Sequence, residues 1–350
     1  MNATRNKLPP GKKPSALVMQ GGGALGAYEW GAVTRLCEAD FYPVAVVGVS
    51  IGAVNAAAIA GAPSGDICAP LERLWRRLMM PTPWFTPECM AETLSAFGNP
   101  AMFRLKTDYS TFPWWTSYCD VSPLRQTLQE LCDFKQINDE RHMGFTVTAT
   151  EIATGELHRF HNGDPKYRIT PDHILASGAL PPGFPMTIVD GKAYWDGGVF
   201  DNTPVRPMFD RLEDDEIDTV PIVIINLFPD KEIGPVPANM LQLKNRLMEL
   251  TYENKFWDEF GGVDELKNYA AMIGALDHAV KDPRVKDNEH FRKLLRRRCL
   301  KNLHVITSDH VPMVGSLDFS ERSVCARYKL GRAAVEDHLK ADGFSRVGQF

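Results

Sequence analysis

Apolar and polar positions alternate between two patterns near the start of the chain. Short, continuously apolar runs at 15–20 (SALVMQ) and 44–49 (VAVVGV) predict strands that are buried on both faces. After each run, apolar residues recur at helical spacing, which predicts helices over 24–39 and 51–60; the second is rich in alanine, so we expect it to pack closely. Strand, helix, strand, helix in this order predicts a parallel sheet covered by helices.

The same patterns continue to the end of the chain. Further strands are expected at 145–150, 156–160, 220–227 and 302–308, and further helices from Ser122-Pro123 onward and over 239–257, 264–280, 289–300 and 320–339. Ser122 and Ser320 are expected to cap their helices. We therefore predict a three-layer α/β/α sandwich with a mostly parallel sheet: a flexible tail at 1–14, a core domain at 15–230 and a mainly helical C-terminal extension at 231–350.

The segment 81–115 differs from the rest because it holds five prolines and eight aromatic residues. A connection this long and irregular is typical of a lid or a binding surface. A loop that packs on its own aromatic rings explains the same composition equally well, so both interpretations stay open.

Composition excludes several classes of protein. With 350 residues, 44% apolar and 24% charged, the chain is an ordinary globular protein, and its net charge of −5 argues against a nucleic-acid partner. Seven scattered cysteines without a CxxC pair favour reduced thiols in a cytoplasmic protein over a disulfide framework or a zinc site. No apolar run approaches the ~20 residues of a membrane span, so contact with lipid is expected to be peripheral. The basic segment 292–301 could bind anionic headgroups, although a solvated helix face paired with nearby acids is the favoured interpretation.

The first candidate motif is the glycine-rich stretch from Gly21 to Gly26, between a predicted strand and a predicted helix. Free amides and the start of a helix favour an anion there. The spacing fits a dinucleotide fingerprint, but that fingerprint requires an acidic residue after the second strand, where this chain has Ser50. An oxyanion hole and a purely structural turn remain as alternatives.

Two further motifs carry nucleophilic chemistry. Gly48-Val49-Ser50-Ile51-Gly52 is a GxSxG between a strand and a helix of small residues, the context of a nucleophile elbow. Asp196-Gly197-Gly198 is a carboxylate before two glycines, which alone would indicate a turn. The order of the three motifs favours a serine hydrolase.

Together these motifs resemble the patatin-like phospholipase family, whose pattern is a glycine-rich oxyanion loop, a GxSxG elbow and an Asp-Gly-Gly/Ala. The segment 176–185 (ASGALPPGFP) is similar to the family's Ala-Ser-x-Ala-x-Pro, and Asn202 and Pro204 fall at its Asn-x-Pro. The resemblance spans about 15–207. Leu25 departs from it, since many members have Arg or Lys there; this leaves backbone amides to hold an oxyanion and lowers the expected affinity for anionic headgroups.

The resemblance implies a bacterial-type acyl hydrolase with Ser50 as nucleophile, Asp196 as base and no catalytic histidine. It implies a lipid or other acyl-ester substrate and neither metal nor organic cofactor. The other residues that it assigns are Gly21, Gly22, Gly23 and Ala24 as the oxyanion hole and Gly26, Gly48, Gly52, Gly197 and Gly198 as elbow and motif glycines.

Alternatives remain at this point. The same pair of residues could serve a soluble esterase, a thioesterase or an intracellular polyester depolymerase, and a classical Ser-His-Asp triad would also use Ser50. A nucleotide-binding module and an inactive scaffold are the non-enzymatic alternatives. For an acyl hydrolase, we expect the segment 81–115 to cover or line the acyl pocket with Trp84, Phe85, Trp114 or Trp115.

Overall fold

The computed structural model describes residues 6, 8–63, 66–83, 85, 86, 90, 95, 97–228, 236, 237, 243, 246, 262–307, 315–341 and 344. Most of the helix predicted at 239–257, and Trp84 in the aromatic segment, lie outside these residues.

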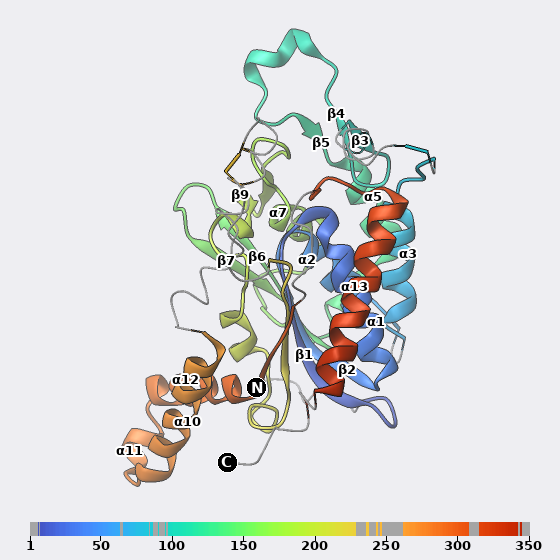
Figure 1. The fold of residues 1–350 in the computed structure, drawn as a ribbon. Helices are drawn as coiled ribbons and strands as arrows, with labels where there is room; N and C mark the ends of the chain where they lie inside the picture. The colour runs from blue at the N-terminus through green and yellow to red at the C-terminus, as the bar shows by residue number, and fades with distance from the viewer. Residues whose placement is uncertain are drawn as a thin grey trace.

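One mixed sheet forms the centre of the molecule (Figure 1). Its strand order is β11-β10-β1-β2-β6-β9-β8, and β7 pairs with β6 on the opposite edge from β9. The pairs β11-β10, β10-β1, β1-β2 and β2-β6 are parallel, whereas β7, β8 and β9 pair antiparallel. The bounds are β1 Lys13–Met19, β2 Phe41–Gly48, β6 Gly144–Glu151, β7 Leu157–His161, β8 Thr187–Val189, β9 Lys192–Asp196, β10 Ile222–Ile225 and β11 Leu303–Ile306.

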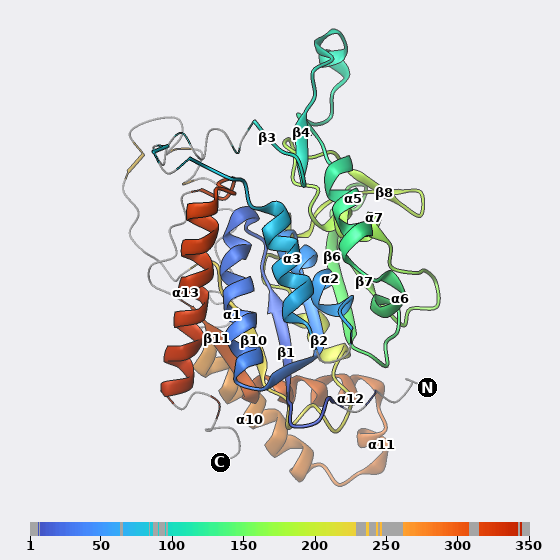
Figure 2. The same cartoon turned by 90° about the vertical axis from the view of Figure 1, so that its right-hand side faces the viewer.

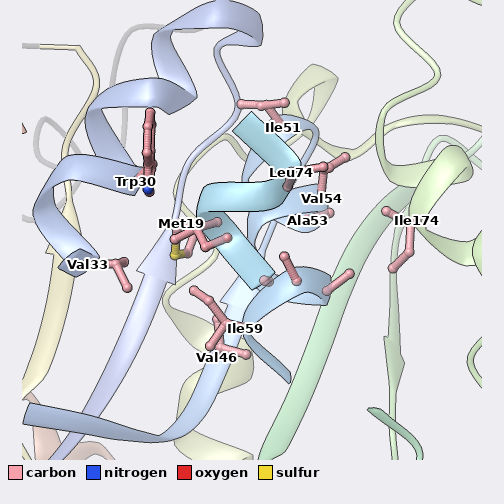
Figure 3. Packing of buried hydrophobic residues seen from close by; sticks show 14 of the residues in the cluster. Met19, Trp30, Val33, Val46, Ile51, Ala53, Val54, Ile59, Leu74 and Ile174 are labelled. Atoms are coloured by element: carbon pink, nitrogen blue, oxygen red, sulfur yellow. The ribbon is translucent and has the colours of Figure 1, made fainter. Parts of the chain in front are cut away.

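The central strands bury both of their faces, as their continuous apolar runs predict. On β1, Leu17 and Met19 join one core cluster and Ala16 and Val18 join another on the opposite face. The first face is covered by α1 (Gly26–Glu38), α2 (Ile51–Ala60), α3 (Cys68–Leu78) and α13 (Glu321–Lys340), as Figure 2 shows. Figure 3 shows side chains of this core cluster at close range, among them Met19, Trp30 and Ile59. The second face is packed against η4 (Arg206–Asp210), α10 (Val263–Ala279) and η5 (Arg297–Asn302). The result is the predicted three-layer α/β/α sandwich with a helical C-terminal region.

Smaller elements complete the fold around the central sheet. They are η1 (Gly23–Leu25), α5 (Ser122–Leu131), α6 (Phe134–Ile137), α7 (Pro171–Ser177), η3 (Gly197–Val199) and a three-stranded sheet of β3 (Gly98–Asn99), β4 (Phe103–Leu105) and β5 (Cys119–Asp120). Between β4 and β5 lies η2 (Tyr109–Trp114). At the other end of the molecule, α11 (Pro283–Lys286) and α12 (Glu289–Arg296) follow α10 (Figure 1).

Several predicted elements differ in detail from the observed ones. Ser122 is the first residue of α5 rather than its cap, because the Asp120 side chain accepts the Ser122 amide. The helix predicted at 289–300 changes to 3-10 geometry after Arg296. Ser320 caps α13 as predicted, accepting the Ser323 amide. In the region predicted as an extension, β11 joins the central sheet and α13 packs on α1, so both are parts of the sandwich.

The basic segment 292–301 is paired with acidic side chains. Arg298 contacts Asp218 and Asp277, and Lys301 also contacts Asp218. Arg296 bonds to Asp214. The acids at 214 and 218 come from the acidic loop at 213–218, so the two charged segments hold α12 and η5 against the core. This favours the structural interpretation of the basic segment over headgroup binding.

Candidate active site

Ser50 occupies a sharp turn between β2 and α2. Its φ of 55° and ψ of −124° place a non-glycine residue in a region that side chains rarely adopt. The turn is held from outside: the Ser50 amide donates to the Ser177 carbonyl at 3.2 Å and to the Ser177 Oγ at 3.1 Å. A strained residue held in this way at the N-terminus of a helix is the geometry of a nucleophile elbow.

The two glycines of the GxSxG motif allow α2 to approach the sheet. A Cβ on Gly48 would lie 2.3 Å from the Gly52 carbonyl oxygen, and one on Gly52 would lie 2.4 Å from the Met19 carbonyl oxygen at the end of β1. Any side chain at either position would push the helix away from the strands. Both glycines therefore fix where Ser50 stands above the sheet.

Strand β6 brings Asp196 to Ser50. Its residues 144–147 pair with the end of β2, where Val147 faces Gly48, and its residues 149–151 pair with β9, where Ala149 faces Asp196. The ends of β2 and β9 therefore meet on the same side of β6. Residues 146 apart in sequence become neighbours through this one strand.

The carboxyl of Asp196 is buried and hydrogen-bonded. Only 2% of the residue is exposed. Its Oδ1 accepts the Gly198 amide at 2.7 Å. Burial raises the pKa of Asp196 to about 7, although the Ser50 side chain and the Gly198 amide both favour the charged form. A carboxylate with this pKa is a much better proton acceptor near neutrality than an exposed one.

The segment 176–185 supports both residues. Ser177 holds the Ser50 turn, and the Ala179 carbonyl accepts the Asp196 amide at 3.0 Å. In the sequence this segment was notable only for its resemblance to the family pattern. The structure shows that this segment positions both Ser50 and Asp196.

The glycine-rich loop lies beside Ser50, and its amides are not equivalent. Asn202 fixes Gly21 by accepting its amide and donating to its carbonyl, both at 3.1 Å. The Ala24 amide donates to the Ser316 carbonyl at 2.7 Å. Within the described part of the chain, the amides of Gly22 and Gly23 have no acceptor. Of the four amides predicted to form an oxyanion hole, those of Gly21 and Ala24 are therefore occupied, and those of Gly22 and Gly23 remain as candidates.

A short strap at 315–318 lies over this loop and is held by Arg327 of α13. The Arg327 guanidinium is buried and donates to the carbonyls of Asp318 at 2.8 Å, Gly315 at 3.0 Å and Ala24 at 3.5 Å. The Ser316 carbonyl would lie 2.2 Å from a Cβ on Gly23, whose φ is +57°, so only glycine fits beneath the strap. Neither the strap nor Arg327 is suggested by a sequence motif.

A second buried network lies under the loop. Glu29 of α1 accepts the Gln20 amide at 2.7 Å and the Asn55 side-chain amide at 2.8 Å, and burial raises its pKa well above the usual range. Asn55 in turn accepts the indole N–H of Trp75 at 2.9 Å. Sequence reasoning missed this network, although Glu29 and Asn55 are isolated polar residues in otherwise apolar helices, a pattern that indicates buried polar contacts.

Ser50 and Asp196 open into a cavity of about 110 Å³. Its walls include the glycine loop and apolar side chains from α2, α5, α7 and the loops around them, among them Leu25, Ile51, Val54, Met102, Leu124, Leu175, Phe184 and Leu317. Among the described residues that line it, Asp196 alone can carry a charge and none is a histidine.

One expectation fails at this cavity. Phe85, Trp114 and Trp115 are not among its lining residues, so the prediction that these aromatics line it is wrong. The aromatic segment contributes Met102 instead. Three histidines that a triad might use lie away from the cavity: His158 and His161 are in β7, and His173 completes the capping box of α7.

The described residues form neither a metal-ion cluster nor a membrane-spanning helix. No group of three or more His, Cys, Asp or Glu side chains is arranged to hold a metal ion in that part of the chain. None of the helices described there combines the length and apolar character needed to cross a bilayer.

Comparison with known proteins identifies the family. The model of the patatin-like phospholipase family matches residues 17–209, more than half of the chain, so the chain belongs to this family of lipid acyl hydrolases. The crystal structure of VipD from Legionella pneumophila aligns over 97% of this chain and 71% of that one, with 15% identity and a TM-score of 0.41, a likeness too low to support further argument. No curated protein matches the sequence.

Proposed function

We propose that the protein hydrolyses carboxylic esters of lipids through Ser50 and Asp196. The placement of Ser50 and a buried carboxylate, whose pKa is raised to about 7, in the wall of one cavity is the observation that carries this proposal. A serine hydroxyl needs an adjacent base, and here the adjacent base is Asp196.

The reaction follows from this pair. As the Ser50 Oγ bonds to the ester carbonyl carbon, Asp196 takes the hydroxyl proton, and the carbonyl oxygen becomes an oxyanion. The amides of Gly22 and Gly23 and the N-terminus of α2 hold that charge. The C–O bond to the alcohol then breaks, Asp196 returns the proton to the alcohol, and an acyl-enzyme remains. Asp196 then takes a proton from a water molecule as the water oxygen bonds to the acyl carbon. The bond from that carbon to the Ser50 Oγ breaks, Asp196 returns the proton to Oγ, and the acid leaves.

The walls of the cavity favour an acyl chain as the bound group. Apart from Asp196 they offer no charge in the described residues, and no cation to hold a phosphate. Leu25, where many family members have a cation, contributes an apolar wall. We therefore place the acyl chain in the cavity and the rest of the substrate outside it. The protein would work in the cytoplasm and meet lipid layers only at their surface.

Labelling with a fluorophosphonate tests the nucleophile. Wild-type protein should be labelled and should hydrolyse p-nitrophenyl esters, and Ser50→Ala should do neither while unfolding at the same temperature. Ser110→Ala, the same change at an exposed position of η2, is the matched control and should match wild type in labelling and in hydrolysis of p-nitrophenyl esters. Labelling that persists on Ser50→Ala would refute the assignment. A parallel panel of thioesters, short-chain esters and phospholipid vesicles distinguishes a lipid hydrolase from a thioesterase or a soluble esterase.

A further inference from the structure

The residues 103–120 form an arm that rises from the rim of the cavity. At its base, the amides of Tyr118 and Cys119 donate to the carbonyls of Pro182 and Gly183 at 3.0 and 2.9 Å. The ring of Phe103 packs edge-on against Phe184, 5.3 Å between centroids, and Phe184 lines the cavity. Figures 1 and 2 show the arm projecting beyond the end of the molecule where β2 leads into α2. Whatever the arm binds is therefore brought to the mouth of the site.

The tip of the arm exposes large aromatic side chains. Tyr109 is 72% exposed, Phe112 53% and Trp114 78%, and all three belong to η2. Trp115 supports them from within: its ring lies 5.8 Å from that of Tyr109 and 5.4 Å from that of Phe112, and its indole N–H donates to Thr111 at 2.8 Å. Exposed aromatic clusters mark interaction sites in soluble proteins, because water contact with such surface is unfavourable.

The charges of the arm cancel. It carries two cations, Arg104 and Lys106, and two carboxylates, Asp108 and Asp120. Arg104 pairs with Asp120 at 2.7 Å, and Asp108 accepts hydrogen bonds from its neighbours in the loop. A surface that is aromatic and neutral complements an uncharged or zwitterionic partner, not a strongly anionic one. Tyr and Trp are also the side chains that prefer the boundary between lipid headgroups and hydrocarbon.

We propose that the tip of the arm inserts into the surface of a zwitterionic lipid layer. Because its base is bonded to the cavity rim, insertion holds the mouth of the cavity against the layer, where an acyl chain can pass into it without crossing water. The entry of an acyl chain into the cavity rests on the proposed function, whereas the insertion of the arm into the lipid layer does not.

Sedimentation with phosphatidylcholine vesicles tests the insertion. All variants carry Ser50→Ala, so that hydrolysis does not alter the vesicles. Changing Tyr109, Phe112 and Trp114 to serine should lower the partition coefficient at least about tenfold, because each ring loses apolar burial in the layer. The matched control changes Tyr269, Met272 and Leu276 to serine on α10, where these side chains are 49%, 63% and 47% exposed at the other end of the molecule. This control should bind as the Ser50→Ala parent.

Assays on soluble esters and on vesicles distinguish lipid binding by the arm from hydrolysis at the active site. With Ser50 restored, the arm variant should hydrolyse a soluble short-chain ester at the wild-type rate and lose activity only on vesicles. Equal vesicle binding by the two triple variants would overturn the proposal. Binding that requires anionic lipid and disappears in salt would also overturn it. So would a dimer, detected by light scattering, that the three substitutions in the arm convert to a monomer. Vesicle binding by a protein that hydrolyses no ester would refute the proposed function and leave the arm's role standing.

Discussion

The burial of the Asp196 carboxyl makes it a better proton acceptor near neutral pH, but it also lowers the stability of the folded protein. The residue is buried, and the Ser50 side chain and the Gly198 amide beside it do not compensate fully for the lost water. The sequence motifs predict the carboxylate and the serine as the reactive pair, because both stand in short patterns with fixed local geometry, and the structure places both in one cavity. It could not show which amides are free, because the Gly21 and Ala24 amides are taken by Asn202 and Ser316, which are far away in sequence.

The pH dependence of hydrolysis should report Asp196. Only the ionised carboxylate can take the Ser50 proton, so kcat/KM for a soluble ester should rise about tenfold per unit of pH below the pKa of about 7 and level off above it. Asp196→Asn should lower turnover by about 10²–10⁴-fold and abolish this limb. A histidine variant, such as His173→Ala, with the same loss of activity would indicate a triad instead.

Asp196→Asn should also stabilise the folded protein at high pH. Because folding raises the pKa of Asp196 from its ordinary 3.8 to about 7, the folded state binds the proton more tightly, and stability falls as the pH rises through this interval. The cost above pH 7 is at most about 4 kcal/mol, from about 1.4 kcal/mol per unit of pKa. In urea unfolding, Asp196→Asn should therefore exceed wild type in stability at pH 8, and the difference should vanish near pH 4. A variant that is less stable at both pH values would contradict this account.

Elements with strong local patterns were predictable, and those defined by distant contacts were not. The helix at 51–60 was predicted residue for residue, because its small residues lie between the GxSxG and a glycine. The positions of the exposed aromatics were not, because an irregular segment has no periodicity to show which way its rings point. The strap at 315–318 has no signal at all, since its role depends on Arg327 and on the glycine loop.

Arg327 should be a positioning residue for the oxyanion loop. Arg327→Met leaves the buried carbonyl of Asp318 without its donor and leaves the Gly315 carbonyl with the Asp318 amide alone, so the strap should move and release the Ala24 amide from Ser316. We expect kcat for a soluble ester to fall about tenfold or more with little change in KM, since small displacements near reacting groups are costly.

Arg327→Lys is the informative companion to this variant. It keeps the charge but has fewer donors in a different geometry, so it should recover part of the kcat lost in Arg327→Met. A purely structural role would lower the unfolding temperature of both variants and leave kcat per labelled Ser50 unchanged.

At the scale of the whole molecule, α13 links the last part of the chain to the active site. It crosses α1, the helix that follows the glycine loop, where Gly31 and Gly331 let the two backbones touch: a Cβ on Gly331 would lie 2.0 Å from the Tyr28 carbonyl oxygen. The rings of Trp30 and Tyr328 pack beside this crossing, 4.1 Å between centroids and tilted by 40°. The first layer of the sandwich is therefore incomplete without residues 321–340.

Gly331→Ala tests this link between α13 and the site. The added methyl meets backbone atoms that cannot rotate away, so α13 must shift, and we expect a loss of about 1–3 kcal/mol in urea unfolding. Arg327 lies one turn earlier on the same helix, so kcat should fall as well, even where the variant is fully folded. Gly274→Ala in α10 is the matched control: nothing lies within 4 Å of the added methyl, and alanine should stabilise that helix by about 0.5–1 kcal/mol with unchanged kcat. If Gly331→Ala destabilises the protein but the folded fraction keeps the wild-type kcat, α13 supports the fold without positioning the oxyanion loop.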